Sequence, residues 1–218
     1  MTYEEIVKNE EVKALIARGN ANLGTLGFTD HSTVHTGIVA KNAGKILEAF
    51  GYSPREVELA KIAGFMHDMG NAINRKNHAE YGALLANDIL RNTDMSLEDR
   101  MVVVSAIGNH DESTGKAVDA VSAALIIADK TDVRRERVRT KEPAAFDIHD
   151  RVNYAVTGQN LRIDAEDKVI SLNLQIDEKI CTMYEYFDIF LGRMLMSRSA
   201  AEVLGATFKI KVNGIKIL

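Results

Sequence analysis

The chain has 218 residues, 46% of them hydrophobic, which is enough for one domain with a sizeable core or for one domain with a small addition. Its formal net charge of −4 disfavours an electrostatic fit of the whole molecule to long nucleic acid. The single cysteine, Cys181, excludes an intramolecular disulfide and a cysteine-rich zinc site. The N-terminus lacks a signal-peptide layout, and no apolar run approaches the roughly 20 residues that span a bilayer. We therefore expect a soluble cytoplasmic protein without membrane contacts.

The first two thirds of the chain have the apolar spacing of helices. Gly19-Asn20 and Gly51 predict helix ends. Ser53-Pro54-Arg55-Glu56 is a strong helix start, because it combines a capping serine, a proline at the first helical position and a glutamate that completes a capping box. The predicted helices cover residues 3–18, from 30 or 31 to 50, 53–67, 78–91, 96–108 and 116–137.

The pattern changes after Pro143. Residues 152–163 and 168–177 predict two strands joined by a hairpin turn, because apolar and polar residues alternate most clearly in the second segment. A helix over 180–204 follows, and 206–217 predict one strand or a small hairpin with Asn213-Gly214 as its turn. The fold class is therefore mainly α, a helical bundle over residues 1–148 with a small C-terminal α+β (ββαβ) subdomain over residues 149–218.

Several side chains that bind metals well fall on predicted buried faces, or at the ends of separate helices. A lone buried histidine is usually a satisfied core residue, but burying several unpaired polar groups together is costly. Helical bundles commonly build metal sites from side chains that project inward from different helices. Imidazole and carboxylate ligands favour a divalent transition metal (Fe, Mn, Co, Ni or Zn) over Mg or Ca. The predicted metal ligands are His35, His67, Asp68, His78, His110 and Asp129.

In this order and local context, these residues resemble the HD superfamily of metal-dependent phosphohydrolases. The resemblance covers about residues 28–137. It implies an HD-domain helical bundle in which His35, His67, Asp68 and Asp129 bind one ion. Members with two additional histidines bind a second ion, bridged by the aspartate of the pair, and His78 and His110 occupy those positions here.

This dinuclear branch includes dinucleoside tetraphosphate hydrolases and cyclic dinucleotide phosphodiesterases. The sequence departs from some members: Asn71 stands near a position where many carry a lysine, and His110 is followed by Asp111 rather than a second histidine. The Glu-Asp pair of the (p)ppGpp hydrolases and the Gly-Tyr-Pro signature of the cyclic di-GMP enzymes are absent from the sequence.

The resemblance implies hydrolysis of a phosphoester or phosphoanhydride bond in a small, nucleotide-type substrate by metal-activated hydroxide, with one or two ions bound. We predict Asp68 and Lys130 as catalytic residues. Lys130, Arg134 and Arg75 are the predicted phosphate contacts, and Lys130 and Arg134 belong to a basic run that reaches Lys141. Two alternatives stay open: a single-metal nucleotidase whose His78 and His110 contact the substrate, and a non-catalytic HD-fold sensor of metal or nucleotide.

Two further features allow more than one interpretation. Asp111 and Asp132 could orient metal ligands from behind, or could be exposed caps. The predicted C-terminal helix has a thick apolar surface that either packs on the helical body or forms a homodimer interface. That surface consists of Tyr184, Tyr186, Phe187, Phe190, Leu191 and Met194. The C-terminal subdomain contains no ligand cluster, so the sequence assigns it no chemistry.

Overall fold

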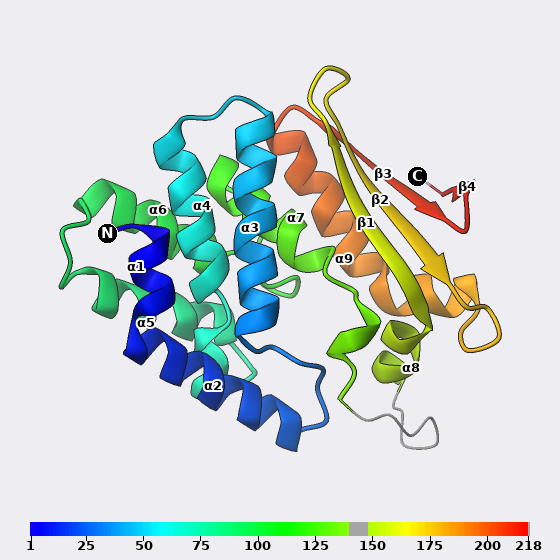
Figure 1. The fold of residues 1–218 in the computed structure, drawn as a ribbon, viewed down its shortest axis with the longest axis horizontal. Coiled ribbons are helices and arrows are strands. Elements are labelled where there is room, and N and C mark those ends of the chain that lie inside the picture. Colours follow the sequence, from blue (N-terminus) through cyan, green and yellow to red (C-terminus); the bar gives the residue numbers. More distant parts are fainter. Residues whose placement is uncertain (140–147, 218) are drawn as a thin grey trace.

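A computed structural model describes residues 1–139 and 148–217 (Figure 1). The first part is a helical body in which α4 packs against α1, α3, α6 and α7. The mainly α fold class is therefore confirmed. Within the described residues, no helix combines the length and the apolar character needed to cross a membrane. The elements of the body are α1 (Tyr3–Lys8), α2 (Glu10–Thr25), α3 (Thr33–Ala49), α4 (Pro54–Met66), η1 (Met69–Ala72), α5 (His78–Leu90), α6 (Leu97–Gly108), α7 (Ala120–Lys130) and η2 (Arg135–Arg137).

The close approach of α3 and α4 depends on a glycine. A Cβ added at Gly64 would lie 2.7 Å from the Cα of Ala40, which is far inside van der Waals contact. The two backbones can therefore approach closely at Gly64. The start of α4 is as predicted, with Ser53 and Glu56 forming a complete capping box. Gly64 lies two residues before the end of α4, so this contact sets the separation between α3 and the residues that follow α4.

The prediction of a single helix over 3–18 is wrong, because this region forms two helices and the second ends later than predicted. The chain breaks at Asn9, whose side chain accepts a hydrogen bond from the Val12 amide and starts α2. Helix α2 then continues through Gly19 to Thr25. A Cβ at Gly19 would come within 3.0 Å of the Ala72 amide nitrogen, so this glycine permits the contact with η1 rather than ending a helix.

The predicted helix over 116–137 is shorter in the structure. Asp119 and Ser122 form a capping box that starts α7, and the Thr131 hydroxyl donates to the Ile127 carbonyl at its end. The chain then leaves helical geometry before η2. The irregular segment includes Asp132, which is fully buried. Asp132 contacts His35 of α3, a long-range contact that the local apolar pattern could not show.

The C-terminal part contains α8 (Ile148–Ala155), β1 (Val156–Asp164), β2 (Val169–Ile176), α9 (Met183–Val203), β3 (Thr207–Val212) and β4 (Ile215–Lys216). The strand predicted over 152–163 is wrong at its start, because residues 152–155 belong to α8. The sheet order is β1-β2-β3-β4, with β2 and β3 parallel and the other neighbours antiparallel. Helix α9 supplies the crossover that a parallel pair requires, and Asn213-Gly214 forms the last turn. The ββαβ(β) order is therefore confirmed.

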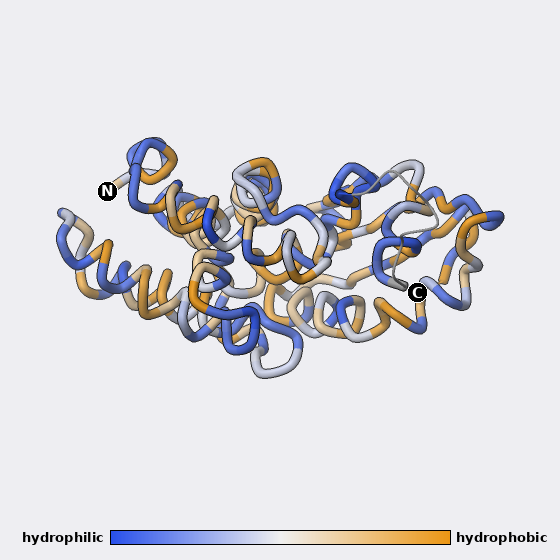
Figure 2. The backbone as a smooth tube through the Cα atoms, turned by 90° about the horizontal axis from the view of Figure 1, so that it is seen from below, coloured by the Kyte–Doolittle hydropathy of each residue, from blue (hydrophilic) through white to orange (hydrophobic). Residues whose placement is uncertain are grey.

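Helix α9 joins the two parts of the molecule, because it packs against α7 on one side and β3 on another (Figure 1). Tyr186, Phe190 and Met194 are buried in the same hydrophobic core as the body helices. Tyr184 and Leu191, on another side of the helix, are 80% and 50% exposed. Figure 2 shows how hydrophobic and hydrophilic positions alternate along the whole backbone. The apolar surface of α9 thus packs on the body through one side only, and a homodimer through the other stays a prediction.

Candidate metal centre

The structure brings all six predicted ligands to one place, although they come from five segments. His35 lies on α3, His67 and Asp68 follow α4, and His78 is the first residue of α5. His110 follows α6, and Asp129 lies near the end of α7. The side chains of the four histidines and Asp68 are at most 5% exposed, and that of Asp129 is 13% exposed.

The first group of ligand atoms comprises those of His35, His67, Asp68 and Asp129. His35 Nε2 lies 3.3 Å from Asp129 Oδ1 and 3.5 Å from Asp68 Oδ2. His67 Nε2 lies 3.6 Å and 3.2 Å from the same two oxygens. Among the described residues, no hydrogen-bond partner reaches His35 Nε2, His67 Nε2 or Asp68 Oδ2, although all three atoms are buried. Each such atom costs about 1–3 kcal/mol when unpaired, so a shared cation fits this site.

The other ring nitrogen of each histidine determines which tautomer is present. The Nδ1 atoms of His67, His78 and His110 donate to the carbonyl oxygens of Gly64, Arg75 and Ile107, at 2.8, 3.1 and 2.6 Å. A carbonyl oxygen can only accept, so Nδ1 carries the proton and Nε2 of the neutral ring presents a lone pair. His35 Nδ1 is held in the same way, 2.7 Å from Asp132 Oδ2. All four rings therefore turn a potential metal-binding nitrogen toward the shared space.

The second group is formed by His78 and His110, whose Nε2 atoms lie 3.1 Å apart. In the neutral tautomers these two lone pairs face each other, and only a proton or a cation between them makes the contact favourable. Asp68 Oδ1 lies 3.8 Å from His78 Nε2, whereas its Oδ2 atom faces His35 and His67. Asp68 therefore stands between the two groups, as a bridging ligand would.

The charges at the site also call for a cation. Burial opposes ionisation of Asp68 and Asp129, but neighbouring imidazoles and the Lys130 ammonium outweigh it and hold both carboxyl pKa values well below their usual range. Burial alone would lower the pKa of His67, but Asp68 and then Asp129 raise it to about 10. Burial lowers the pKa of His110 well below its usual value. A metal ion would replace the proton that these carboxylates hold on His67.

Two aspartates support the ligands from behind. Asp132 is fully buried, so the interpretation as an exposed cap is wrong for this residue. It accepts from His35 Nδ1 and from Arg134, whose Nε and Nη2 atoms lie 2.5 and 3.0 Å from its oxygens. Asp111 Oδ2 lies 3.4 Å from His78 Nδ1. Such partners orient metal-binding imidazoles and increase their basicity.

Cations surround the ligand groups. Lys130 Nζ lies 2.8 Å from Asp129 Oδ2, and Arg75 Nη1 lies 3.3 Å from His78 Nε2. Arg134, a predicted phosphate contact, instead lines a separate surface cavity with Gly158 and Gln159. Lys141 lies outside the described residues. A cavity of about 20 Å³ is lined by His31, Asp68, Arg75, His78, His110, Asp129, Lys130, Arg137 and Arg193.

Three of these cavity residues were not predicted as site residues. His31 has a sequence signal, because it lies one turn before His35, and its ring centroid is 5.4 Å from that of His35. Arg137 belongs to the basic run and is buried, with hydrogen bonds to the Asp30 and Asp132 carbonyls. Arg193 has no signal in the sequence, because it lies in the middle of a helix in the C-terminal part.

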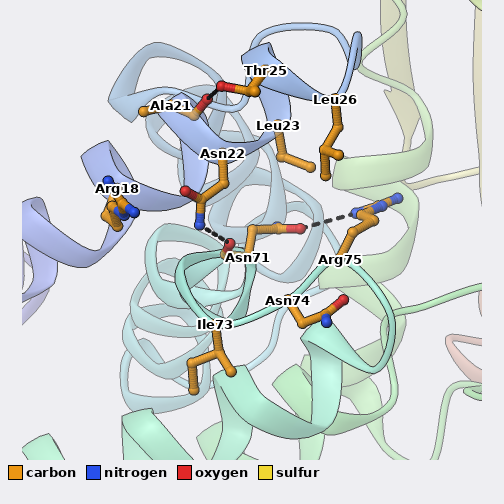
Figure 3. Close-up of a pocket in the computed structure, with 10 residues that line it drawn as sticks. All are labelled: Arg18, Ala21, Asn22, Leu23, Thr25, Leu26, Asn71, Ile73, Asn74 and Arg75. Atoms are coloured by element: carbon orange, nitrogen blue, oxygen red, sulfur yellow. Dashed lines mark hydrogen bonds between the residues drawn. The ribbon is translucent and has the colours of Figure 1, made fainter.

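A larger cavity of about 560 Å³ adjoins the ligand groups (Figure 3). It lies between α2 and the segment from η1 to Arg75, and Asn22, Leu26 and Ile73 are among its lining residues. Asn71 and Arg75 connect it to the candidate metal centre. The Asn71 amide donates to Asp68 Oδ1 at 2.8 Å and its oxygen accepts from Arg75 at 3.4 Å. Arg75 therefore lines both cavities.

The model of the HD domain family matches residues 33–154, which include all six candidate ligands. The chain belongs to the HD superfamily of metal-dependent phosphohydrolases. It is 30% identical over 173 residues to Uncharacterized protein MJ1020 of Methanocaldococcus jannaschii, an alignment that covers 68% of this chain and 66% of that protein. It is 32% identical over 110 residues to Ribonuclease Y of Enterococcus faecalis, covering 49% of this chain and 19% of that protein.

This HD-family chain thus spans less than two thirds of the length of either relative. A crystal structure of a predicted HD superfamily hydrolase from an uncultured Thermotogales bacterium is 22% identical in sequence. Its TM-score is 0.46, and the match covers 62% of this chain and 75% of the other.

Proposed function

We propose that this HD-family chain hydrolyses a phosphoester or phosphoanhydride bond in a small, nucleotide-type substrate. The observation that carries the proposal is the convergence of three buried, unpartnered atoms: His35 Nε2, His67 Nε2 and Asp68 Oδ2. With Asp129, these residues would hold one divalent transition-metal ion. His78 and His110, with the other oxygen of Asp68, would hold a second.

Such ions lower the pKa of a bound water and stabilise negative charge on a phosphoryl group. The chain's own residues prepare the site for this chemistry. Asp132 keeps the proton of His35 on Nδ1, and Asn71 donates to Asp68 Oδ1, which restricts the rotation of that carboxylate. Lys130 holds Asp129 Oδ2, so Asp129 Oδ1 turns toward His35 and His67. Lys130 is the residue best placed to meet a phosphate oxygen beside the ions.

The substrate class is inferred from the cations and from the larger cavity. Lys130, Arg137 and Arg75 line the small cavity together with the ligands, and guanidinium groups match phosphate oxygens in geometry. The guanidinium of Arg134 holds Asp132, so we place it behind His35 rather than on the phosphate. The 560 Å³ cavity beside Arg75 is in the usual size range of ligand sites and suits a nucleoside. One relative is named a ribonuclease, which supports a nucleotide phosphodiester among the candidates.

A single-metal nucleotidase is the second candidate, and one contact favours it. The Arg75 guanidinium lies 3.3 Å from His78 Nε2, the atom that would bind the second ion. If this contact persists in the active protein, His78 and His110 bind substrate together with Arg75. The stoichiometry of bound metal separates the candidates: about two ions per chain support the dinuclear site and about one supports the alternative.

The proposal is tested by metal analysis of the purified protein, followed by a phosphate-release screen with Mn or Fe over mononucleotides, dinucleoside polyphosphates and cyclic dinucleotides. We expect His67→Ala to remove metal and turnover together. Asp88→Ala, on the exposed side of α5, is the control and should change neither. Less than about half an ion per chain, unaffected by His67→Ala, would contradict the metal site. Metal without turnover on any substrate would favour a sensor.

A further inference from the structure

One side chain from the C-terminal part of the chain lines the small cavity at the candidate metal centre. It is that of Arg193 on α9, which lines this cavity together with Asp68, Asp129 and Lys130. Helix α9 packs against α7, the helix that carries Asp129 and Lys130. The guanidinium carbon of Arg193 lies 4.6 Å from the centre of the Phe190 ring, and Phe190 is 1% exposed. A buried ring thus fixes where the guanidinium lies.

The other cavity cations already have partners within the site. Lys130 lies on Asp129 at 2.8 Å, and Arg137 donates to two backbone carbonyls at 3.0 and 2.6 Å. Arg75 contacts Asn71 and His78. Arg193 differs from these three cations in its partner. It forms an ion pair with a loop residue that is not one of the candidate metal ligands.

That loop residue is Glu112, between α6 and α7, with a side chain that is 40% exposed. Its Oε2 atom lies 3.5 Å from Arg193 Nε and 3.7 Å from Lys130 Nζ. Both distances are long for charge-assisted hydrogen bonds, which are usually about 2.7–2.9 Å. The Glu112 side chain is 40% exposed and that of Arg193 is 25% exposed, and ion pairs with this much exposure are weak, so an anion with shorter contacts can displace the carboxylate. One carboxylate therefore lies between two cations at the edge of the cavity, where an anionic group of a substrate could replace it.

We propose that Arg193 binds a second anionic group of the substrate, distinct from the phosphoryl group that Lys130 meets at the metal centre, and that this group displaces Glu112 from its position between the two cations. The inference rests on the proposed function and narrows it to substrates that carry a second anionic group, such as a second phosphate. It also gives the C-terminal part a role in specificity. Arg193 is a substrate-binding residue in this scheme, and Glu112 is an internal competitor for the same position.

The test compares two probes by titration calorimetry on the metal-loaded protein: inorganic phosphate, with one anionic group, and methylenediphosphonate, with two. We expect Arg193→Ala to weaken diphosphonate binding at least about tenfold and to change phosphate binding less than about twofold. Arg193→Lys should fall between, because it keeps the charge but loses the planar donor pair. Glu112→Gln should tighten diphosphonate binding about threefold, because the competing charge is gone.

Arg198→Ala is the matched control, since Arg198 lies on the same helix and pairs with exposed Glu202. Metal content is measured after each titration, to show that the diphosphonate has not removed the ions. Equal weakening of both probes by Arg193→Ala, or no weakening of either, would overturn the proposal, as would unchanged diphosphonate binding in Glu112→Gln. If Arg193→Ala does not fold, Arg193→Lys and Glu112→Gln still decide the matter.

The outcome is independent of turnover, because binding is measured directly. A protein without hydrolase activity that still selects diphosphonate through Arg193 would contradict the proposed function and leave this anion site standing. A hydrolase whose diphosphonate binding is unchanged by substitution of Arg193 or Glu112 would support the proposed function and contradict this anion site.

Discussion

Replacing Asp132 tests whether the centre depends on a residue that lies behind the ligands. Its carboxylate accepts a hydrogen bond from His35 Nδ1 at 2.7 Å, and both side chains are fully buried. Asp132→Asn keeps the shape and one acceptor but removes the charge. A hydrogen bond to a charged group contributes about 1.5–3 kcal/mol and a neutral one about 0.5–1.5 kcal/mol. The loss is therefore about 1–1.5 kcal/mol, which corresponds to about tenfold weaker metal binding.

The orientation of the new amide adds to this loss. If the asparagine oxygen faces His35, its NH2 group faces Arg134 Nε, a donor that Asp132 Oδ1 accepts in the native protein. Arg134 is 25% exposed, so it can turn into solvent and leave the amide in place. Asp132→Ala leaves His35 Nδ1 with no acceptor at this position, and we expect its effect to approach the upper end of the 10- to 100-fold range typical of such partners.

The assay is competition for the metal against a chromophoric chelator. The control is Asp99→Asn, which removes the same charge from an aspartate–arginine pair, that of Asp99 with Arg55, on another part of the surface. Metal affinity within about twofold of wild type in both Asp132 variants would refute the reasoning. So would equal weakening by Asp99→Asn, because the effect would then come from charge loss anywhere in the protein.

Three other predictions concern packing, protons and the thiol. Gly70→Ala should lower the free energy of unfolding by about 1–3 kcal/mol or more, because its Cβ would lie within 2.5 Å of the Gly82 amide nitrogen and closer still to the His78 carbonyl. Urea denaturation measures this, with Gly37→Ala as the control because an added Cβ has open space there. An unchanged midpoint for Gly70→Ala would contradict the packing. Metal affinity should rise between about pH 6 and about pH 8, because the pKa of His67 is raised and metal binding must release the proton of that imidazole. Competition against a chelator across this pH range measures how steeply the affinity rises. A flat profile would exclude proton release. Burial raises the pKa of the Cys181 thiol, so less thiolate forms at mildly alkaline pH. Ellman's reagent should therefore react far more slowly with the native than with the denatured protein. Equal rates would show that the thiol is accessible in the native protein.

Much of the centre could be predicted, because each ligand carries a local signal. His35 lies four residues before buried Val39, and His67 ends a helix with a complete capping box, so periodicity alone places both toward the interior. The family resemblance then supplied the grouping into two ion sites. Where local signals conflicted with packing, the predictions failed: Gly19 resembled a helix end but permits a close contact with η1.

The sequence by itself determined the class of the fold, the extent of most helices and the identity of the six ligand candidates, because helical periodicity and capping act over a few residues. Tertiary structure alone decided which side chains meet. It placed Asp132 on His35 by ending α7 early, moved Arg134 away from the cavity, and brought Arg193 beside Lys130 from 63 positions along the chain. Such contacts follow from the close packing of α3 on α4 and of α9 on α7, and no pattern within one helix encodes the distance between two helices.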